Sequence, residues 1–171
     1  MAVNLFLCQQ SGVMQNQQDT ITDKGIFLSY EKYLDWVATD PLWKQKAKSM
    51  TSVWIYNPNG VLILRGGELP PDGMMFEQTD KLSAFKNVKE LYLSSLHVND
   101  LPDSFIQLQK LEKLELAFTV DANIKHIIKV LSQLKSLKKL NIDASTLTTK
   151  HRKAFIKEME KKGVHFNGAF N

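Results

Sequence analysis

The sequence lacks several features that mark particular classes of protein. Its single cysteine, Cys8, excludes an internal disulfide bond and therefore a disulfide framework. It contains no run of about 18 apolar residues, so no helix is expected to span a bilayer. The hydrophobic fraction of 43% and the charged fraction of 23% are ordinary for a folded chain. At 171 residues, these properties predict one soluble globular domain.

Motifs for catalysis are also absent from the sequence. It has no Walker loop, no GxGxxG, no HExxH and no GxSxG. The four histidines, His97, His126, His151 and His165, lie in separate segments without a paired Cys or Glu at ligand spacing, and they are expected at the surface. Cys8 has no basic neighbour to lower the pKa of its thiol. We therefore predict no enzymatic activity, no metal and no cofactor.

The opening segment MAVNLFLC is apolar but lacks the features of an export signal. No Lys or Arg precedes its apolar residues, and no small-residue cleavage site follows them. Leu7 stands before Cys8, where a bacterial lipoprotein has a small residue. A cytoplasmic protein is therefore expected, with export or lipid anchoring as the alternative if a leader is missing upstream.

One phrase occurs three times between residues 82 and 142, as LSAFKNVKELYL, FIQLQKLEKLEL and LSQLKSLKKLNI. Aligned, the three copies form five columns that are apolar throughout: Leu82, Phe105 and Leu131; Phe85, Leu108 and Leu134; Val88, Leu111 and Leu137; Leu91, Leu114 and Leu140; Leu93, Leu116 and Ile142. The copies are offset by 23 and then by 26 residues. A period of this length predicts a stacked array whose units share one core.

The phrase LxxLxL resembles the leucine-rich repeat over about residues 60 to 166. The resemblance implies an α/β solenoid with a short curved parallel sheet of about four to six strands and a convex side of mixed helices and irregular segments. Residues 1–50 are expected to form a lead-in and a helical N-terminal cap of the same domain, and residues 51–171 the repeat domain with a C-terminal cap. Leu96 and Thr119 stand where many such repeats carry Asn, which indicates a short, irregular stack.

Residues 9–22 are polar and aperiodic, which predicts a loose lead-in. Helical spacing begins at Tyr30, with Ser29 as its cap, and a second helix is expected after Asp40-Pro41 with Leu42, Trp43 and Ala47 on its buried side. The runs VWIY and VLIL around NPNG predict a hairpin, in which Leu62 and Leu64 would continue the leucine columns.

Between the repeats, LPDSF is too short for more than a single turn, whereas residues 124–131 have helical spacing and Asn123 as a cap. A final helix is expected to begin at a Thr149 cap and to end at Gly163, before a last strand over residues 164–166. That strand would cover the last leucines.

Residues between the strand leucines are predicted to point to the concave face, because strand side chains alternate. The candidate binding residues are Arg65, Glu90, Tyr92, Ser94, Lys113, Glu115, Lys139, Asn141 and Asp143. Val61 and Ile63 would belong either to this surface or to a core under Trp36 or Trp43 of the N-terminal helices. Glu90 beside Lys113, and Glu115 near Lys139, could equally be cross-strand pairs that only stabilise the sheet.

The features together predict a non-catalytic scaffold that binds a protein or peptide through the concave face. Nucleic acid is not an expected partner, because the lysines behind the +4 net charge alternate with leucines without interleaved aromatic residues. Two alternatives remain open: an adaptor acting through its N-terminal helices, since YLDWVATDPLWKQKA resembles the end of an F-box motif, and an exported surface protein. The oligomeric state and the partner's identity are not indicated.

Overall fold

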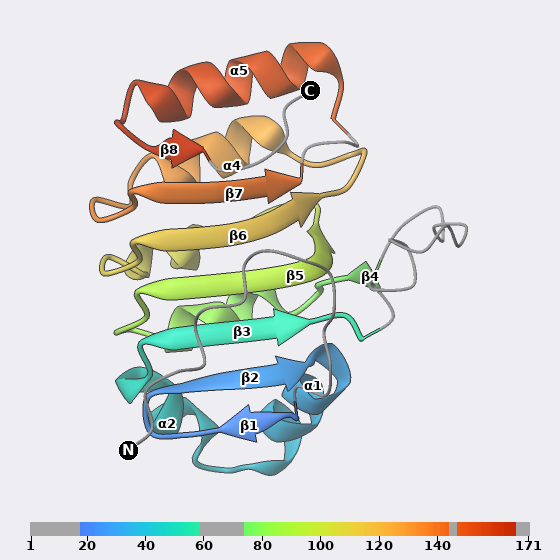
Figure 1. Ribbon diagram of the computed structural model, residues 1–171, viewed down its shortest axis with the longest axis vertical. Coiled ribbons are helices and arrows are strands. Elements are labelled where there is room, and N and C mark those ends of the chain that lie inside the picture. The colour runs from blue at the N-terminus through green and yellow to red at the C-terminus, as the bar shows by residue number, and fades with distance from the viewer. Residues whose placement is uncertain (1–17, 59–73, 144–146, 167–171) are drawn as a thin grey trace.

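The strands of the chain form one sheet that is almost entirely parallel. The computed structural model describes residues 18–58, 74–143 and 147–166. Its strands are β1 (Thr20–Ile21), β2 (Gly25–Ser29), β3 (Ser52–Tyr56), β4 (Met74–Met75), β5 (Glu90–Val98), β6 (Lys113–Phe118), β7 (Lys139–Asp143) and β8 (His165–Phe166). They lie in the order β1-β2-β3-β5-β6-β7-β8, and β4 pairs with β5 (Figure 1). The pairing of β1 with β2 is antiparallel, and the other pairings among the described strands are parallel.

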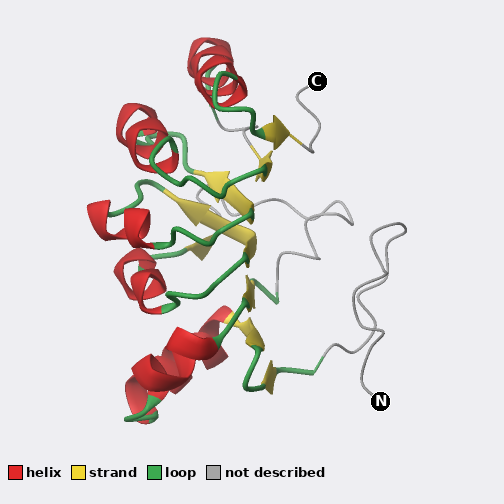
Figure 2. Ribbon diagram, turned by 90° about the vertical axis from the view of Figure 1, so that its left-hand side faces the viewer, coloured by secondary structure: helices red, strands yellow, loops and turns green. Residues whose placement is uncertain are grey.

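Helical segments connect the parallel strands along one side of the sheet. They are α1 (Tyr30–Thr39), α2 (Trp43–Ser49), the 3₁₀ segments η1 (Thr79–Ala84) and η2 (Asp103–Gln107), α4 (Ile124–Leu131) and α5 (Thr149–Glu160). All of them lie on the same side, which we call the back face, and the opposite side is the front face (Figure 2). In the described ranges, no helix is both long and apolar enough to cross a membrane. The protein is thus a mixed α/β fold with a parallel sheet.

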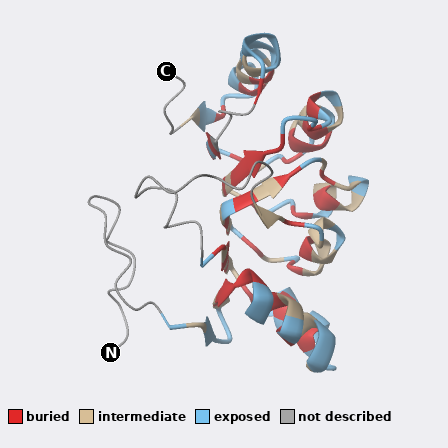
Figure 3. Cartoon of the chain, turned by 90° about the vertical axis from the view of Figure 1, so that its right-hand side faces the viewer, coloured by how far each residue is buried: buried red, intermediate tan, exposed pale blue. Residues whose placement is uncertain are grey.

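The apolar columns of the repeats form the core between the sheet and the back-face helices (Figure 3). Leu91, Leu114 and Leu140 lie side by side in register on β5, β6 and β7, and each is at most 1% exposed. Leu116 lies opposite Ile142 in the same way. Burying one such side chain contributes about 1.5–3 kcal/mol. The repeated phrase therefore specifies both the strands and the face that they bury.

The columns continue toward the N-terminus through residues that the sequence did not indicate. Val53 and Ile55 of β3 lie opposite Leu91 and Leu93 of β5 and are completely buried. Val53 and Ile55 thus occupy the positions beside β5 that the leucine spacing had favoured for Leu62 and Leu64. Leu62 and Leu64 themselves, and the expected hairpin partner VLIL, lie outside the described residues.

Two strands precede α1, where a loose lead-in through residue 22 and a purely helical cap were expected. Strand β2 runs parallel to β3, with Gly25 opposite Ser52. A Cβ atom at Gly25 would lie 2.2 Å from the Ser52 carbonyl oxygen, so this close approach requires glycine. Helices α1 and α2 therefore connect two neighbouring strands of the sheet. The division of this one domain after residue 50 remains a prediction.

Helix α1 begins at Tyr30 after Ser29, as predicted, whereas α2 begins at Trp43 and not directly after Asp40. Tyr33 and Trp36 of α1 are buried, with Tyr33 against Phe76 and Trp36 against Trp43 and Phe85. Trp36 and Trp43 thus pack into the core behind the sheet, whereas Val61 and Ile63 lie outside the described residues.

The expected burial of Leu42 is wrong, since the side chain is 54% exposed. Its backbone N–H donates to Asp40 Oδ1 at 2.9 Å, and Leu42 occupies the N-cap position of α2. A cap residue does not share the buried face of the helix that follows, so the local pattern assigned this leucine to the wrong side.

The connections between the repeats agree with the sequence. Segment η2 is a single short 3₁₀ turn, and α4 is a true helix capped by Asn123, whose side chain accepts from the His126 N–H. The cap of α5 is Thr148 and not Thr149: the Thr148 hydroxyl accepts from the His151 N–H at 3.3 Å. After α5, Gly163 adopts a φ of 71° and β8 pairs in parallel with β7.

Strand β5 is longer than its neighbours and irregular. Its register with β6 shifts between Tyr92 and His97, and Ser95 within this interval has a φ of 57°. Beyond the shift, β4 pairs with Leu96 and His97. Leu96 and Thr119, where the resemblance to leucine-rich repeats would place Asn, are both buried. The pairing of β5 with β6 is therefore locally irregular, whereas β6 and β7 pair in continuous register.

Candidate functional site

Alternation along β2, β3, β5, β6 and β7 directs every second side chain to the front face. The structure brings together there seven of the nine residues predicted from the sequence: Glu90, Tyr92, Ser94, Lys113, Glu115, Lys139 and Asn141. Asp143 is the last residue of β7, where it lies opposite Ala117. Arg65 lies outside the described residues. A role in binding remains a prediction for all nine.

A row of aromatic side chains crosses three adjacent strands of the front face. Phe27 of β2, Trp54 of β3 and Tyr92 of β5 are direct neighbours in register. The ring centroids of Trp54 and Tyr92 are 4.7 Å apart and stacked at 29°, and those of Phe27 and Trp54 are 5.5 Å apart. All three side chains are half-buried, although they face away from the core. We call these three residues the aromatic row.

Tyr56 extends this apolar area toward the end of β3. Its ring centroid lies 4.9 Å from that of Phe27, and its hydroxyl donates to Asp19 Oδ1 at 3.2 Å. The same carboxylate oxygen accepts from the Ser29 N–H at 2.6 Å. Burial and then the Asp19 carboxylate raise the pKa of Tyr56, so its hydroxyl stays a proton donor at neutral pH. Asp19 thus anchors one border of the front face.

Phe27, Trp54 and Tyr56 were not among the predicted binding residues, because those candidates came only from strands that carry the leucine pattern. The signal that could have found two of them is the run SVWIY, in which apolar Val53 and Ile55 alternate with Trp54 and Tyr56. Phe27 lies in GIFLS, which is apolar at three consecutive positions and gives no clear alternation. Its place on the front face follows only from its register with β3.

Next to the aromatic row lies a row of charges. Lys113 Nζ is 2.5 Å from Glu90 Oε1, and the Tyr92 hydroxyl lies 3.4 Å from Glu90 Oε2. Burial, and then the negative charge of Glu90 and of Glu115, raise the pKa of Tyr92 to about 12. The expected pair of Glu90 with Lys113 is therefore present. As a partly exposed cross-strand pair it contributes about 0.2–1 kcal/mol.

The second expected pair, Glu115 near Lys139, does not form. Glu115 lies opposite Asn141 and accepts from the Asn141 side-chain amide at 2.8 Å, while the Ser94 hydroxyl donates to its other oxygen at 2.8 Å. Lys139 instead lies opposite Lys113. The register between β6 and β7 is the reason. Each β6 residue lies opposite the β7 residue 26 positions later in the sequence, whereas Glu115 and Lys139 are 24 positions apart. The front face therefore changes from aromatic on β2 and β3 to hydrogen-bonding and charged on β6 and β7.

A separate polar cluster surrounds His126 at the edge where the strands end. Its Nδ1 lies 2.8 Å from Asp100 Oδ1, and its Nε2 lies 3.2 Å from Asp103 Oδ1. These two carboxylates, Asp100 first, raise the pKa of His126. Each ring nitrogen faces a different carboxylate, so the three side chains do not converge on one point. Within the described ranges, no group of three or more His, Cys, Asp or Glu residues is arranged to hold a metal ion.

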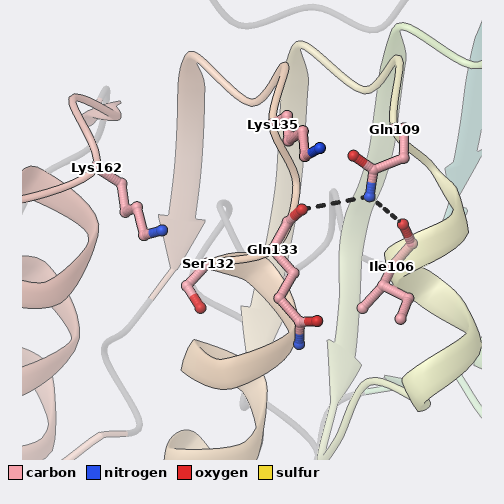
Figure 4. Close-up of a pocket in the computed structure, with 6 residues that line it drawn as sticks. All are labelled: Ile106, Gln109, Ser132, Gln133, Lys135 and Lys162. Carbon is pink, nitrogen blue, oxygen red and sulfur yellow. Dashed lines mark hydrogen bonds between the residues drawn. The ribbon is translucent and has the colours of Figure 1, made fainter.

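A hollow of about 510 Å³ lies on the back side, between the segments that precede β6, β7 and β8 (Figure 4). Its lining residues are Ile106, Gln109, Ser132, Gln133, Lys135 and Lys162. The Gln109 amide donates to the carbonyl oxygens of Ile106 and Gln133, and the Ser132 hydroxyl to that of Lys129. The polar side chains thus stabilise the turns, and the lining offers two lysines but no paired acid and base.

Comparison with protein-family models and with curated proteins gives no match to the chain. Among solved structures, the chain is similar to a leucine-rich repeat protein of Leptospira interrogans, with 18% sequence identity and a TM-score of 0.45. The similarity covers 71% of this chain and 27% of that protein, so the chain spans about a quarter of its length. The strand register and the side-chain contacts described above define the class as a mixed α/β protein with a parallel sheet.

Proposed function

We propose that the chain is a short leucine-rich-repeat-type domain that binds a protein or peptide, without catalysis, through the front face of its sheet. The proposal of the repeat class is supported by the apolar columns, whose members Leu91, Leu114 and Leu140 are neighbours on successive parallel strands. Structures of this kind stack units that cannot bury their own apolar faces, and the strand side chains facing away from the core are left for partners.

The observation that carries the binding proposal is the aromatic row. Large aromatic side chains usually occupy the core, yet Phe27, Trp54 and Tyr92 stand half-buried on the side away from it. Aromatic residues dominate the centres of protein interfaces, since they bury much apolar area while losing little rotational freedom. We infer that the apolar part of a partner packs on this row.

The residues that lie opposite one another on successive strands suggest how a peptide would lie across the front face. The register line Phe27, Trp54, Tyr92, Glu115 and Asn141 crosses five strands. With strands about 4.8 Å apart, this line is roughly 19 Å long, which an extended peptide of about six residues would span. One end of such a peptide would meet aromatic rings, and the other would meet the Glu115 carboxylate and the Asn141 amide.

Selection of peptides from a random display library on the intact chain would test the proposal. The selected peptides would then be measured against the double variant Trp54→Ala/Tyr92→Ala and against a matched control, Lys125→Ala/Lys153→Ala, on exposed positions of α4 and α5. Removing two central aromatic residues should weaken binding by about thirtyfold or more, which corresponds to about 2 kcal/mol. Equal binding to the front-face variant and to the intact chain would refute the proposal.

The alternative, an adaptor acting through the N-terminal helices, is favoured by one observation. Leu42, between α1 and α2, is 54% exposed and is apolar. If these helices contact the partner, Leu42→Ser should weaken peptide binding while Trp54→Ala/Tyr92→Ala should not. The two variants therefore separate the two functions in a single set of measurements.

A further inference from the structure

The turns that lead into the strands are stacked on one another at the edge of the sheet where the parallel strands begin (Figure 1). The Lys89 N–H donates to the Thr51 carbonyl oxygen at 2.8 Å. In the same way, the Glu112 N–H donates to the Lys89 carbonyl oxygen at 2.8 Å, and the Lys138 N–H donates to the Glu112 carbonyl oxygen at 2.9 Å. Neighbouring strands lie about 4.8 Å apart. Side chains at equivalent positions of successive turns are therefore held in rows with this spacing.

These rows consist largely of lysine. Four exposed lysines on this edge have no carboxylate or other side-chain partner within the described part of the chain: Lys24, Lys48, Lys135 and Lys162. A fifth, Lys89, forms no ion pair, but after Lys138 it contributes to lowering the pKa of the Glu112 carboxyl. Three more are held by side chains of neighbouring turns. Lys86 donates to Gln107, Lys110 to Asn87 at 2.6 Å, and Lys138 to Glu112 at 3.0 Å. We call these eight lysines the basic edge.

Positive charge exceeds negative charge on the basic edge. The carboxylates in the same turns are Asp23 and Glu112, so this edge carries more net positive charge than the +4 of the whole chain. The strands and the described turns toward the opposite edge, residues 91–108, 114–124, 140–143 and 147–149, contain no Lys or Arg. The repeat thus separates charge between its two edges. Like charges at this spacing repel one another unless a partner of opposite sign lies beside them.

We infer that the basic edge is a second interaction surface, separate from the front face, and that it binds an acidic polypeptide segment of a partner protein. The turns at residues 22–24, 48–51, 86–89, 109–112, 135–138 and 161–164 contain no Arg, Phe, Tyr or Trp. Single-stranded nucleic acid is normally held by aromatic side chains stacked on its bases, and these turns offer none. Lysine is a compact charge on a flexible stem, which suits individual carboxylates better than bidentate recognition.

The first test is binding of a labelled glutamate decapeptide to the intact chain, followed by fluorescence anisotropy. The decapeptide should bind at about 50 mM salt and weaken about tenfold by 200 mM, because exposed charges are screened over a Debye length of roughly 10 Å at 0.1 M. A glutamine decapeptide should not bind. Absence of binding by the glutamate peptide would overturn the inference.

A pair of charge-matched variants locates the surface. Lys48→Glu/Lys135→Glu/Lys162→Glu reverses three unpaired lysines of the basic edge and should weaken the glutamate peptide at least about tenfold. The control, Lys32→Glu/Lys125→Glu/Lys153→Glu, changes net charge equally on exposed positions of α1, α4 and α5 and should weaken it less than threefold. Equal weakening by both variants would mean a general charge effect and would overturn the inference. Thermal melting of each variant checks that it is folded.

Other anionic partners are outcomes of the same assay. Tighter binding of a ten-nucleotide oligothymidylate, or of phosphatidylserine vesicles, than of the glutamate peptide would overturn the assignment to an acidic polypeptide. The front-face variant Trp54→Ala/Tyr92→Ala should bind the glutamate peptide as the intact chain does. Failure at the basic edge is therefore distinguishable from failure of the proposed front-face function.

Discussion

Replacing Gly25 with alanine tests the part of the fold that the sequence did not predict, the pairing of β2 with β3. A Cβ atom at this position would lie 2.2 Å from the Ser52 carbonyl oxygen, far inside an ordinary contact of 3.4–4 Å. The obstacle is backbone, so it cannot rotate away as a side chain would. The two strands must therefore part by about 1 Å at this point for alanine to be accommodated.

Parting the strands lengthens the hydrogen bonds beside Gly25. The Thr51 and Ser52 N–H groups both donate to the Lys24 carbonyl oxygen, at 2.7 and 3.2 Å. Each such bond contributes about 0.5–1.5 kcal/mol, and the gain from a less flexible unfolded chain offsets about 0.4–1 kcal/mol. We expect Gly25→Ala to lower the free energy of unfolding by about 1–3 kcal/mol, and Tm by roughly 2–4 °C for each kcal/mol.

Urea denaturation followed by circular dichroism measures this loss, with Gly163 as the comparison. A Cβ atom at Gly163 meets nothing within 4 Å, but its φ of 71° disfavours alanine. Gly163→Ala should therefore cost about 1 kcal/mol, and Gly163→Asn less, since Asn tolerates this conformation. If Gly25→Ala unfolds within about 0.5 kcal/mol of the unaltered protein, the close β2–β3 pairing described above is incorrect.

Three further predictions concern the repeats and the C-terminal end. Thr148→Ala should destabilise the protein by about 1 kcal/mol in urea denaturation because it removes the α5 cap, whereas Thr149→Ala should change little. Phe155→Ala should cost about 3–5 kcal/mol, since the ring is 1% exposed; a loss below about 1 kcal/mol would contradict its burial. The pKa of His126 is raised, so its protonated form stabilises the folded state. This stabilisation is fully present below the ordinary imidazole pKa of about 6.5, and it is lost as the pH rises through the raised pKa. His126→Gln should remove this part of the pH dependence of Tm, and unchanged pH profiles would disprove it.

Much of the fold could be predicted from the sequence because its elements are defined by local patterns. The apolar columns of the three repeats identify β5, β6 and β7 and the face that they bury. The α4 helix and its Asn123 cap follow from helical spacing over eight residues, and the stop at Gly163 follows from the conformation that glycine permits. In each case the information lies within a few residues of the element itself.

The candidate site was only partly predictable for the same reason. Glu90, Tyr92 and Lys113 could be assigned to the front face because they alternate with leucines inside the repeats. Trp54 lies outside the repeats, and its contact with Tyr92 depends on which strand pairs with β5. The sequence favoured residues 61–64 for that position, since they contain leucines at the expected spacing.

The sequence by itself determined a repeated apolar core, the alternation of its strands and the positions of its main helices, because side-chain periodicity specifies which face an element buries. Tertiary structure decided which strands are neighbours, and with that the aromatic row across β2, β3 and β5 and the gathering of lysines at one edge. Hydrogen bonding between strands is non-local: Gly25 meets Ser52, and Trp54 meets Tyr92, only once the intervening chain has crossed behind the sheet. No pattern within one strand encodes that choice of partner.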